Sequence, residues 1–240
     1  MSDISSPLQP AVVLGIAPHP DDLDVGAGGT LAAYSAQGAA IHYLILTDGG
    51  KGSDDASLSS TDLVAIRQTE QQRALEIVGG GSITFLDYPD GELEVTLQLK
   101  KQIVTAIRQL KPDVVITLDP TFIYDVKKGM INHPDHRAAG QATLDAVFPL
   151  ARDHLTFPDL NVEGITAHKV PTVLMINFQA TNFGVDISQT FQTKLNAIRA
   201  HTSQFSNSDQ LSWVRTMAQE QGELYGHDLS EGFVRIDLQT

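Results

Sequence analysis

Short apolar runs alternate with longer amphipathic segments along most of the chain. The apolar runs are typical of strands that are buried on both faces of a sheet. They lie at 11–17, 41–47, 82–88, 113–119 and 170–178. The segments between them have helical periodicity and end near glycine or proline, which predicts helices. These helices are expected at 26–38, 60–81, 96–112, 134–149, 188–204 and 208–222.

The alternation of strands and helices predicts βαβ units, which build a parallel sheet. We therefore expect an α/β fold, a Rossmann-like three-layer sandwich with a mostly parallel central sheet. A last apolar run at 232–238 is expected to close the sheet at an edge, and the segment from Asp119 to Asn132 is expected to be a long loop. No repeat or linker interrupts the pattern, so one domain is expected for residues 1–240, with residues 1–10 as a flexible N-terminal tail.

Composition and charge exclude several classes of protein. The 240 residues are 42% hydrophobic and 19% charged, as in ordinary globular domains. The formal net charge of −13 disfavours anionic partners, so no nucleic acid is expected to bind. No apolar stretch approaches the roughly 20 residues of a membrane span. The chain does not open on a basic segment followed by an apolar run, so no signal peptide is expected. These features predict a cytoplasmic protein.

Histidines and aspartates gather just after the predicted strands. The four stretches are APHPDDLD after the first strand, TDGGKGS after the second, DYPDGEL after the third and LDPTFIYDVKKGMINHPDHR after the fourth. In open parallel sheets, ligands bind beyond the carboxyl ends of the strands. The sequence therefore predicts that these stretches converge on one site. Because the chain has no cysteine, any metal there must be held by His, Asp or Glu.

The tetrapeptide HPDD begins at residue 19, and HPDH begins at residue 133. His19, Asp22 and His136 would supply two imidazoles and one carboxylate, a set that suits Zn²⁺ with one position left for water, or Fe²⁺. A bound cation would also stabilise the crowded acids, which repel one another when ionised. The alternative is that each His-Pro-Asp is only a favourable turn and helix start. Its recurrence at two strand ends favours the metal.

At these motifs the chain resembles the LmbE/PIG-L family of zinc-dependent N-acetylglucosaminyl deacetylases. The resemblance rests on PHPDDLDVGAGGTLA and NHPDHRAAG. It is supported by LTDGGKGS, IRQTEQQRALEIVG, FLDYPDGEL, LKPDVVIT and KLNAIRAHTSQF, which follow in the family's order over most of residues 11–204. The glycines of GAGGT do not fit the dinucleotide-binding spacing, so they are expected to permit close packing of a helix on the sheet.

The resemblance implies a role for each residue of the two motifs. Zinc would be bound by His19, Asp22 and His136. Asp21 would be the general base, and His133 would lie beside the scissile carbonyl as an acid or an oxyanion partner. This division is physically reasonable, because adjacent side chains point in different directions, so one carboxylate can bind the ion while the other takes a proton from water.

Four further polar residues each have two interpretations. Asp135 is expected to orient His133, or to cap a helix. Asp24 is expected to hydrogen-bond a zinc-bound histidine, or to be an acid in the first turn of a helix. Arg67 is expected to bind substrate, as the resemblance implies, or to form a surface pair three residues along a helix with Glu70. The same resemblance assigns Asp90 to substrate hydroxyls, and the alternative is a simple turn.

Two other features of the resemblance stay open. The oxyanion partner besides zinc could be Tyr124, Asn132 or His133 alone. His201 matches a family feature, but a buried structural histidine is the preferred interpretation.

The predicted function is a zinc-dependent hydrolase that removes the acetyl group from an N-acetylated amino sugar or its conjugate. One alternative is a zinc hydrolase of another amide or ester. The other is a Rossmann-like protein that binds a nucleotide or SAM, in which the histidine motifs are structural. The expected partner is a small-molecule N-acetylated sugar or glycoconjugate, and assembly into a homo-oligomer is left open.

Overall fold

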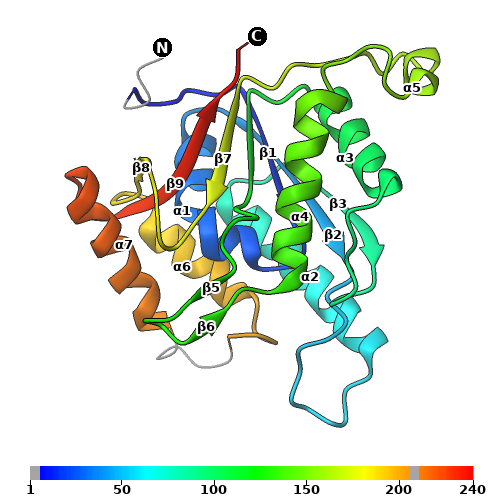
Figure 1. The fold of residues 1–240 in the computed structure, drawn as a ribbon. Coiled ribbons are helices and arrows are strands. Elements are labelled where there is room, and N and C mark those ends of the chain that lie inside the picture. The colour runs from blue at the N-terminus through cyan, green and yellow to red at the C-terminus, as the bar shows by residue number, and fades with distance from the viewer. Residues whose placement is uncertain (1–5, 206–210, 240) are drawn as a thin grey trace.

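A seven-stranded sheet runs through the centre of the protein in the computed structural model, which describes residues 6–205 and 211–239 (Figure 1). The strand order is β3-β2-β1-β4-β7-β9-β8. The bounds are β1 Val12–Ala17, β2 Ala40–Thr47, β3 Ser82–Tyr88, β4 Val114–Leu118, β7 Thr172–Ile176, β8 Phe183–Asp186 and β9 Ser230–Asp237. The five strands from β3 to β7 are parallel, as the alternation of strands and helices predicted.

The far end of the sheet differs from the prediction for residues 232–238. Strand β9 pairs antiparallel with β7 on one side and with β8 on the other, so its predicted place at the edge is wrong. The edge is taken by β8, which has four residues including a glycine and is too short to stand out in the sequence.

Helices cover both faces of the sheet and make three layers (Figure 1). One face carries α1 (Asp22–Ala36), α2 (Ser60–Val78) and α6 (Phe191–Ala200). The other carries α3 (Leu97–Leu110), α4 (Pro134–Asp145), the short irregular segment η1 (Ala146–Leu150) and α5 (Pro158–Val162). Helix α7 (Ser212–Tyr225) packs on β8 and β9. In β1, Val13 packs into the first face and Leu14 into the second, so every position of the strand is apolar.

Several element boundaries differ from those predicted. Helix α1 begins at Asp22 rather than at residue 26, so Asp22 and Asp24 lie in its first turn and Asp21 is its N-cap. Helix α4 ends at Asp145 because Phe148 is extended and Pro149 has no N–H to donate. The expected long loop contains a small hairpin, formed by β5 (Tyr124–Asp125) and β6 (Met130–Ile131).

The last two helices also begin later than predicted. Helix α6 begins at Phe191 and ends at Ala200 rather than spanning 188–204. The predicted helix 208–222 corresponds to α7, and its first residues, 208–210, lie outside the described part of the chain.

Two of the three glycines of GAGGT, Gly26 and Gly29, permit the close packing that was expected. A Cβ added to Gly26 would lie 2.6 Å from Cδ1 of Ile176 in β7, and one added to Gly29 would lie 2.8 Å from Ile187. Both contacts are shorter than real Cβ contacts, so only glycine lets α1 approach this closely.

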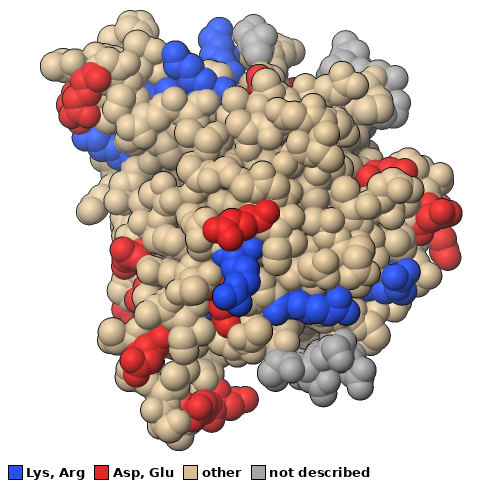
Figure 2. Space-filling view, turned by 180° about the vertical axis from the view of Figure 1, so that it is seen from behind, with Lys and Arg blue, Asp and Glu red and all other residues tan. Residues whose placement is uncertain are grey.

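Residues 1–5 of the predicted N-terminal tail lie outside the described residues. In the remainder, Leu8 packs against the core and the Ser6 carbonyl accepts a hydrogen bond from Arg235. Figure 2 shows basic and acidic side chains scattered over the face seen from behind. None of the helices in the described part of the chain combines the length and apolarity needed to cross a bilayer.

Candidate active site

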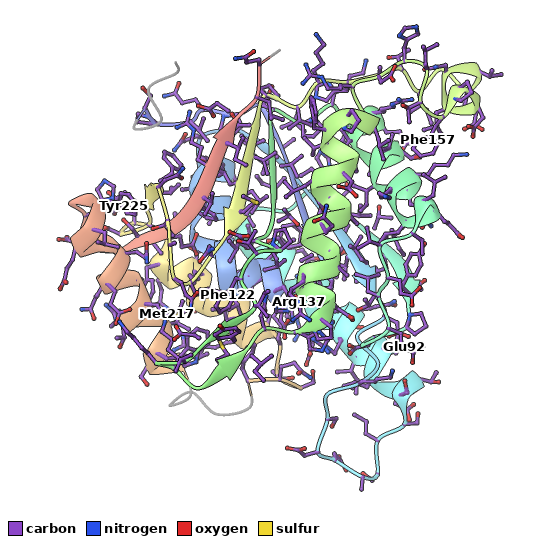
Figure 3. The ribbon with its side chains drawn as sticks, viewed as in Figure 1. Glu92, Phe122, Arg137, Phe157, Met217 and Tyr225 are labelled. Carbon is purple, nitrogen blue, oxygen red and sulfur yellow. The ribbon has the colours of Figure 1, made fainter. Side chains whose placement is uncertain are left out.

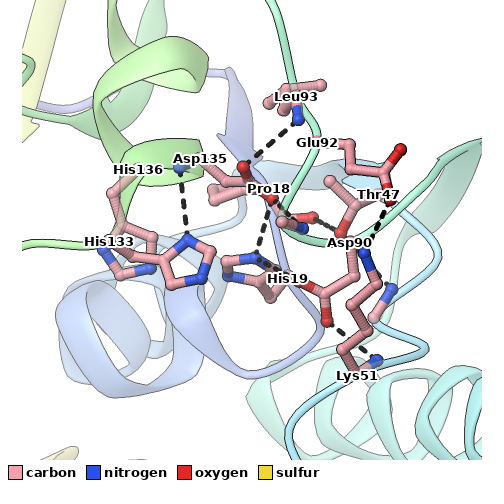
Figure 4. Close-up of polar contacts among 12 residues, drawn as sticks. Pro18, His19, Thr47, Lys51, Asp90, Glu92, Leu93, His133, Asp135 and His136 are labelled. Atoms are coloured by element: carbon pink, nitrogen blue, oxygen red, sulfur yellow. Dashed lines mark hydrogen bonds and ion pairs between the residues drawn. The ribbon is translucent and has the colours of Figure 1, made fainter.

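The two His-Pro-Asp motifs meet at the carboxyl ends of the parallel strands. His19 follows β1, Asp90 follows β3, and His133 and His136 lie at the start of α4, beyond the β5–β6 hairpin. In Figure 4 the His19 ring lies between His133 and Asp90, with Asp135 above it. The ring centroids of His19 and His133 are 4.7 Å apart. The predicted convergence is therefore confirmed.

His19, Asp22 and His136 form one compact set of donor atoms. One ligand atom from each residue lies within 4.8 Å of the other two. The Asp22 carboxylate bridges the set, with Oδ2 at 3.2 Å from Nδ1 of His19 and Oδ1 at 3.0 Å from Nε2 of His136. Two imidazole nitrogens and a carboxylate oxygen at such separations fit a zinc ion with one position left open.

Both histidines have partners that fix their rings. Nδ1 of His136 is 3.0 Å from Oδ1 of Asn132, which favours a proton on Nδ1 and leaves Nε2 free to bind an ion. Nε2 of His19 faces two carboxylates, Asp90 at 3.2 Å and Asp135 at 3.3 Å. They favour a proton on Nε2 and leave Nδ1 on the side of Asp22.

A second set of donors, His19, Asp90 and His133, also comes within 4.8 Å. Both sets need His19. The first set is the better candidate for an ion, because the carboxylates beside Nε2 of His19 match a protonated nitrogen.

The buried carboxylates of this cluster favour a positive charge close to them. Burial by itself lowers the pKa of His19, but the carboxylates of Asp22, Asp135 and Asp90 outweigh it and raise this pKa to about 12. Burial and the charge of Asp22 raise the pKa of Asp21 to about 6. Burial opposes ionisation of Asp22 as well, but His136 and His19 hold its pKa well below the usual range. A divalent cation would neutralise the same excess of negative carboxylate charge.

Asp21 is held apart from the donor set. Its backbone φ is +107°, and its N–H donates to Oε1 of Gln71 at 2.8 Å. Its carboxylate is 3.3 Å from Nη2 of Arg67. The adjacent carboxylates of Asp21 and Asp22 thus have different partners, which is the division expected from the sequence.

His133 is the N-cap of α4. Its Nδ1 accepts the backbone N–H of Asp135 at 3.2 Å, so a neutral ring carries its proton on Nε2. Burial is the main cause that lowers the pKa of His133, which favours this neutral form. The ring can therefore donate a hydrogen bond to an oxygen of a bound ligand.

A cavity of about 300 Å³ opens beside these groups. Its lining residues come from all four predicted stretches, from α2 and from the loop after α6, and are His19, Asp21, Lys51, Gly52, Arg67, Asp90, Gly91, His133 and Gln204. This volume is at the lower end of the range typical of small-molecule sites.

Comparison with known proteins decides the family. The family model "PIG-L: GlcNAc-PI de-N-acetylase" matches residues 14–147. The chain belongs to the PIG-L family. The matched part of this PIG-L family chain contains both histidine motifs and all three donors of the proposed ion site.

Two curated relatives of this chain are named as deacetylases. The diacetylchitobiose deacetylase of Thermococcus kodakarensis is 37% identical over 92% of this chain and 81% of the relative. A Bacillus anthracis protein named as a probable N-acetyl-alpha-D-glucosaminyl L-malate deacetylase 2 is 30% identical, with 81% of each chain covered. Among solved structures, the N,N'-diacetylchitobiose deacetylase of Pyrococcus horikoshii superposes with a TM-score of 0.87 at 32% identity, covering 95% of this chain and 84% of that one.

Asp24 and Asp135 do not have the hydrogen-bond partners that were predicted from the sequence. In the described part of the chain, Asp24 accepts hydrogen bonds from Tyr43, Gln71 and His201, and none from His19. Nε2 of His19 faces Asp90 and Asp135 instead, and the carboxylate of Asp135 also accepts the N–H groups of Gly91 and Leu93. The carboxylate of Asp135 therefore does not bond to His133, whose ring accepts the backbone N–H of Asp135 instead, and His133, rather than Asp135, is the N-cap of α4. Asp24 does not reach His19 because its position on α1 turns its side chain away from the donor set and towards α2.

Arg67 and Glu70 are both buried and do not form the alternative surface pair. Arg67 donates to the carbonyls of Pro20 at 2.7 Å and Gly49 at 3.1 Å, and so joins the loops after β1 and β2. Glu70 instead accepts hydrogen bonds from Thr202 and Ser203. Arg67 and Asp90 both line the cavity, where their predicted role in binding substrate stays a prediction.

Sequence reasoning missed Gln71 and Gln204, and gave Asn132 a different role. No sequence signal distinguishes Gln71 from the other glutamines of its helix. Asn132 donates to the carbonyl of Phe122 at 2.7 Å and accepts from His136, so both ends of its amide are engaged. Phe122 lies close to the lower end of α4 in Figure 3. Tyr124 is 59% exposed and is not among the residues that line the cavity.

Proposed function

We propose that the protein is a zinc-dependent hydrolase that removes the acetyl group from an N-acetylglucosamine unit of a small glycoconjugate. The observation that carries the proposal is the set formed by His19, Asp22 and His136, with Asp21 and His133 beside it around one cavity. Membership of a de-N-acetylase family supports the reaction, and the deacetylase names of the two relatives support the substrate class.

His19, Asp22 and His136 would hold the ion. When bound, zinc supplies Lewis acidity and brings the pKa of a water ligand near neutrality. The partners described above would keep the ligand nitrogens deprotonated and turned to one point: Asn132 for His136, and Asp135 for His19.

Asp21 would act as the general base. Its carboxylate lines the cavity without belonging to the donor set, so it can accept the proton of the attacking water. The guanidinium of Arg67 would fix the orientation of this carboxylate. Asp21 could then return the proton to the leaving amine.

His133 would bind the carbonyl oxygen of the acetyl group. With Nδ1 engaged by the N–H of Asp135, the Nε2–H is the group free to donate to the negative charge that develops on that oxygen. Arg67 and Asp90 would contact the hydroxyl groups of the sugar. We expect the substrate to be cytoplasmic.

An acetate-release assay on N-acetylglucosamine, diacetylchitobiose and N-acetylglucosaminyl conjugates tests the reaction, together with metal analysis. We expect about one zinc per chain, release of one acetate per amine formed, and loss of zinc on His136→Ala. Asp21→Asn is the matched variant for the base, because asparagine tolerates positive φ. It should keep the zinc and lose most turnover. Full turnover in this variant, or no acetate from any substrate, would overturn the proposal.

A further inference from the structure

The backbone of Asp21 has an unusual conformation that other residues must support. Its φ of +107° lies outside the regions that non-glycine residues favour. It occupies the N-cap position of α1 without a side-chain hydrogen bond to the helix. Its N–H instead points away from α1, to Oε1 of Gln71 at 2.8 Å.

Gln71 is fully buried in α2, and both ends of its amide are engaged. Nε2 donates to Oδ2 of Asp24 at 2.7 Å while Oε1 accepts from Asp21. A carboxylate can only accept hydrogen bonds, so Asp24 requires the NH₂ end of the amide on its own side. The carbonyl oxygen of Gln71 is thereby turned towards the N–H of Asp21.

Asp24 is fixed in its turn. It is fully buried and accepts from the hydroxyl of Tyr43 at 3.2 Å and from Nε2 of His201 at 2.9 Å. Tyr43 belongs to β2 and His201 caps the end of α6, so the acid is tied to two residues that do not line the cavity. This gives a role to Asp24 and His201, which the proposed mechanism does not use.

We propose that Gln71 and Asp24 are positioning residues that hold Asp21 in the conformation needed for proton transfer. The inference rests on the proposed function of Asp21 as the general base. Among the described residues, Gln71 alone supplies an acceptor to the N–H of Asp21, and Asp24 determines which end of the amide does so. Neither side chain lines the cavity, so both act through Asp21.

Two near-isosteric variants break the chain of hydrogen bonds. Gln71→Met keeps the length of the side chain and removes both hydrogen bonds. Asp24→Asn keeps the shape but replaces one acceptor oxygen with an NH₂ group. With that group on the side of Gln71, the amide of Gln71 must flip, and two donors then face each other at Asp21. We expect kcat to fall on the order of 10- to 100-fold in each, with KM and zinc content unchanged, because small displacements of a catalytic group have effects of this size.

A charge-conserving swap provides the decisive variant. In the double variant Asp24→Asn/Gln71→Glu, the new carboxylate at position 71 can accept from both the amide introduced at position 24 and the N–H of Asp21. The direction of the hydrogen bond at Asp21 is thereby restored. We expect kcat of the double variant to be at least tenfold higher than kcat of Asp24→Asn alone. Packing by itself would not produce this recovery, since all these variants have nearly the same volume.

The control is Gln72→Met, one residue further along α2, where the side chain is exposed and bonds only to Glu76 among the described residues. It should leave kcat unchanged. A crystal structure of metal-free Gln71→Met gives a readout that does not depend on activity, and we expect φ of Asp21 to leave the positive region. This inference would be overturned by any of three results. These are a wild-type kcat in Gln71→Met, a kcat of the double variant no higher than that of Asp24→Asn, or an unchanged φ of Asp21 in the crystal structure. An inactive wild type would instead overturn the proposed function.

Discussion

The carboxylate of Asp135 lies 3.3 Å from Nε2 of His19, although 116 residues separate the two in sequence. The same carboxylate accepts the backbone N–H groups of Gly91 and Leu93. Asp135 is 1% exposed, so these contacts are protected from water. One side chain of α4 thus ties the loop after β3 to the histidine that follows β1.

Asp135→Asn should weaken zinc binding about 10- to 100-fold, the usual cost of losing a partner that orients a ligand histidine. The amide has one acceptor oxygen for the three donors that the carboxylate now serves. Chelator competition measures the zinc Kd. The matched control is Asp145→Asn at the other end of α4, where the acid bonds to Lys100 and Gln141. An unchanged Kd in Asp135→Asn would contradict the role given to this residue.

Asn132 should determine the affinity of His136 for the ion. Asn132→Leu removes the acceptor beside Nδ1 of His136, whereas Asn132→Asp keeps an acceptor there and replaces the donor to Phe122 with a carboxylate oxygen. We expect zinc affinity to fall about tenfold or more in the leucine variant and to change less in the aspartate variant. Equal losses in the two variants would show that the hydrogen bond to Phe122, rather than to His136, is what matters.

Two glycines of α1 should respond in opposite ways to the same substitution. Gly26→Ala places a Cβ 2.6 Å from Ile176 and should cost about 1–3 kcal/mol of unfolding free energy through overpacking. Gly28→Ala meets Lys194 at 3.5 Å, an ordinary contact, and should be neutral or stabilise by up to about 1 kcal/mol because alanine favours the helix. Urea unfolding of both variants measures the difference. Similar stabilities would argue against close packing of α1 on β7.

His201 should make folding stability depend on pH. Burial lowers the pKa of His201, but the hydrogen bond and charge of Asp24, with Asp21 and Glu70, outweigh it and raise this pKa above its ordinary value of 6.5. The folded protein therefore holds this proton more tightly than the unfolded chain. The stabilisation is complete below pH 6.5 and is lost as the pH rises through the folded pKa.

Urea unfolding across roughly pH 5.5 to 9 compares wild type with His201→Gln, which has no titrating group at this position. We expect the stability advantage of the wild type to shrink above pH 6.5, the ordinary pKa of the group. A constant difference across the range would show that His201 does not change protonation on unfolding.

The parallel part of the fold could be predicted from the sequence because its central strands, β1, β4 and β7, are apolar at nearly every position. Such strands fit only between two layers of helices, which fixed the architecture before any contact was known. The antiparallel end could not be predicted in the same way. Strand β8 has only four residues, and the pairing of β9 with both β7 and β8 depends on contacts between distant segments.

The sequence by itself determined which residues converge at the site. His19, Asp22 and His136 follow strands that end at the same edge of a parallel sheet, and that topology brings them together. Only the tertiary structure decided which acid serves which partner. Asp24 turned to Gln71 and His201, and Asp135 turned to His19, because the direction of a side chain depends on where its helix begins and what packs against it. A local sequence pattern does not contain that information.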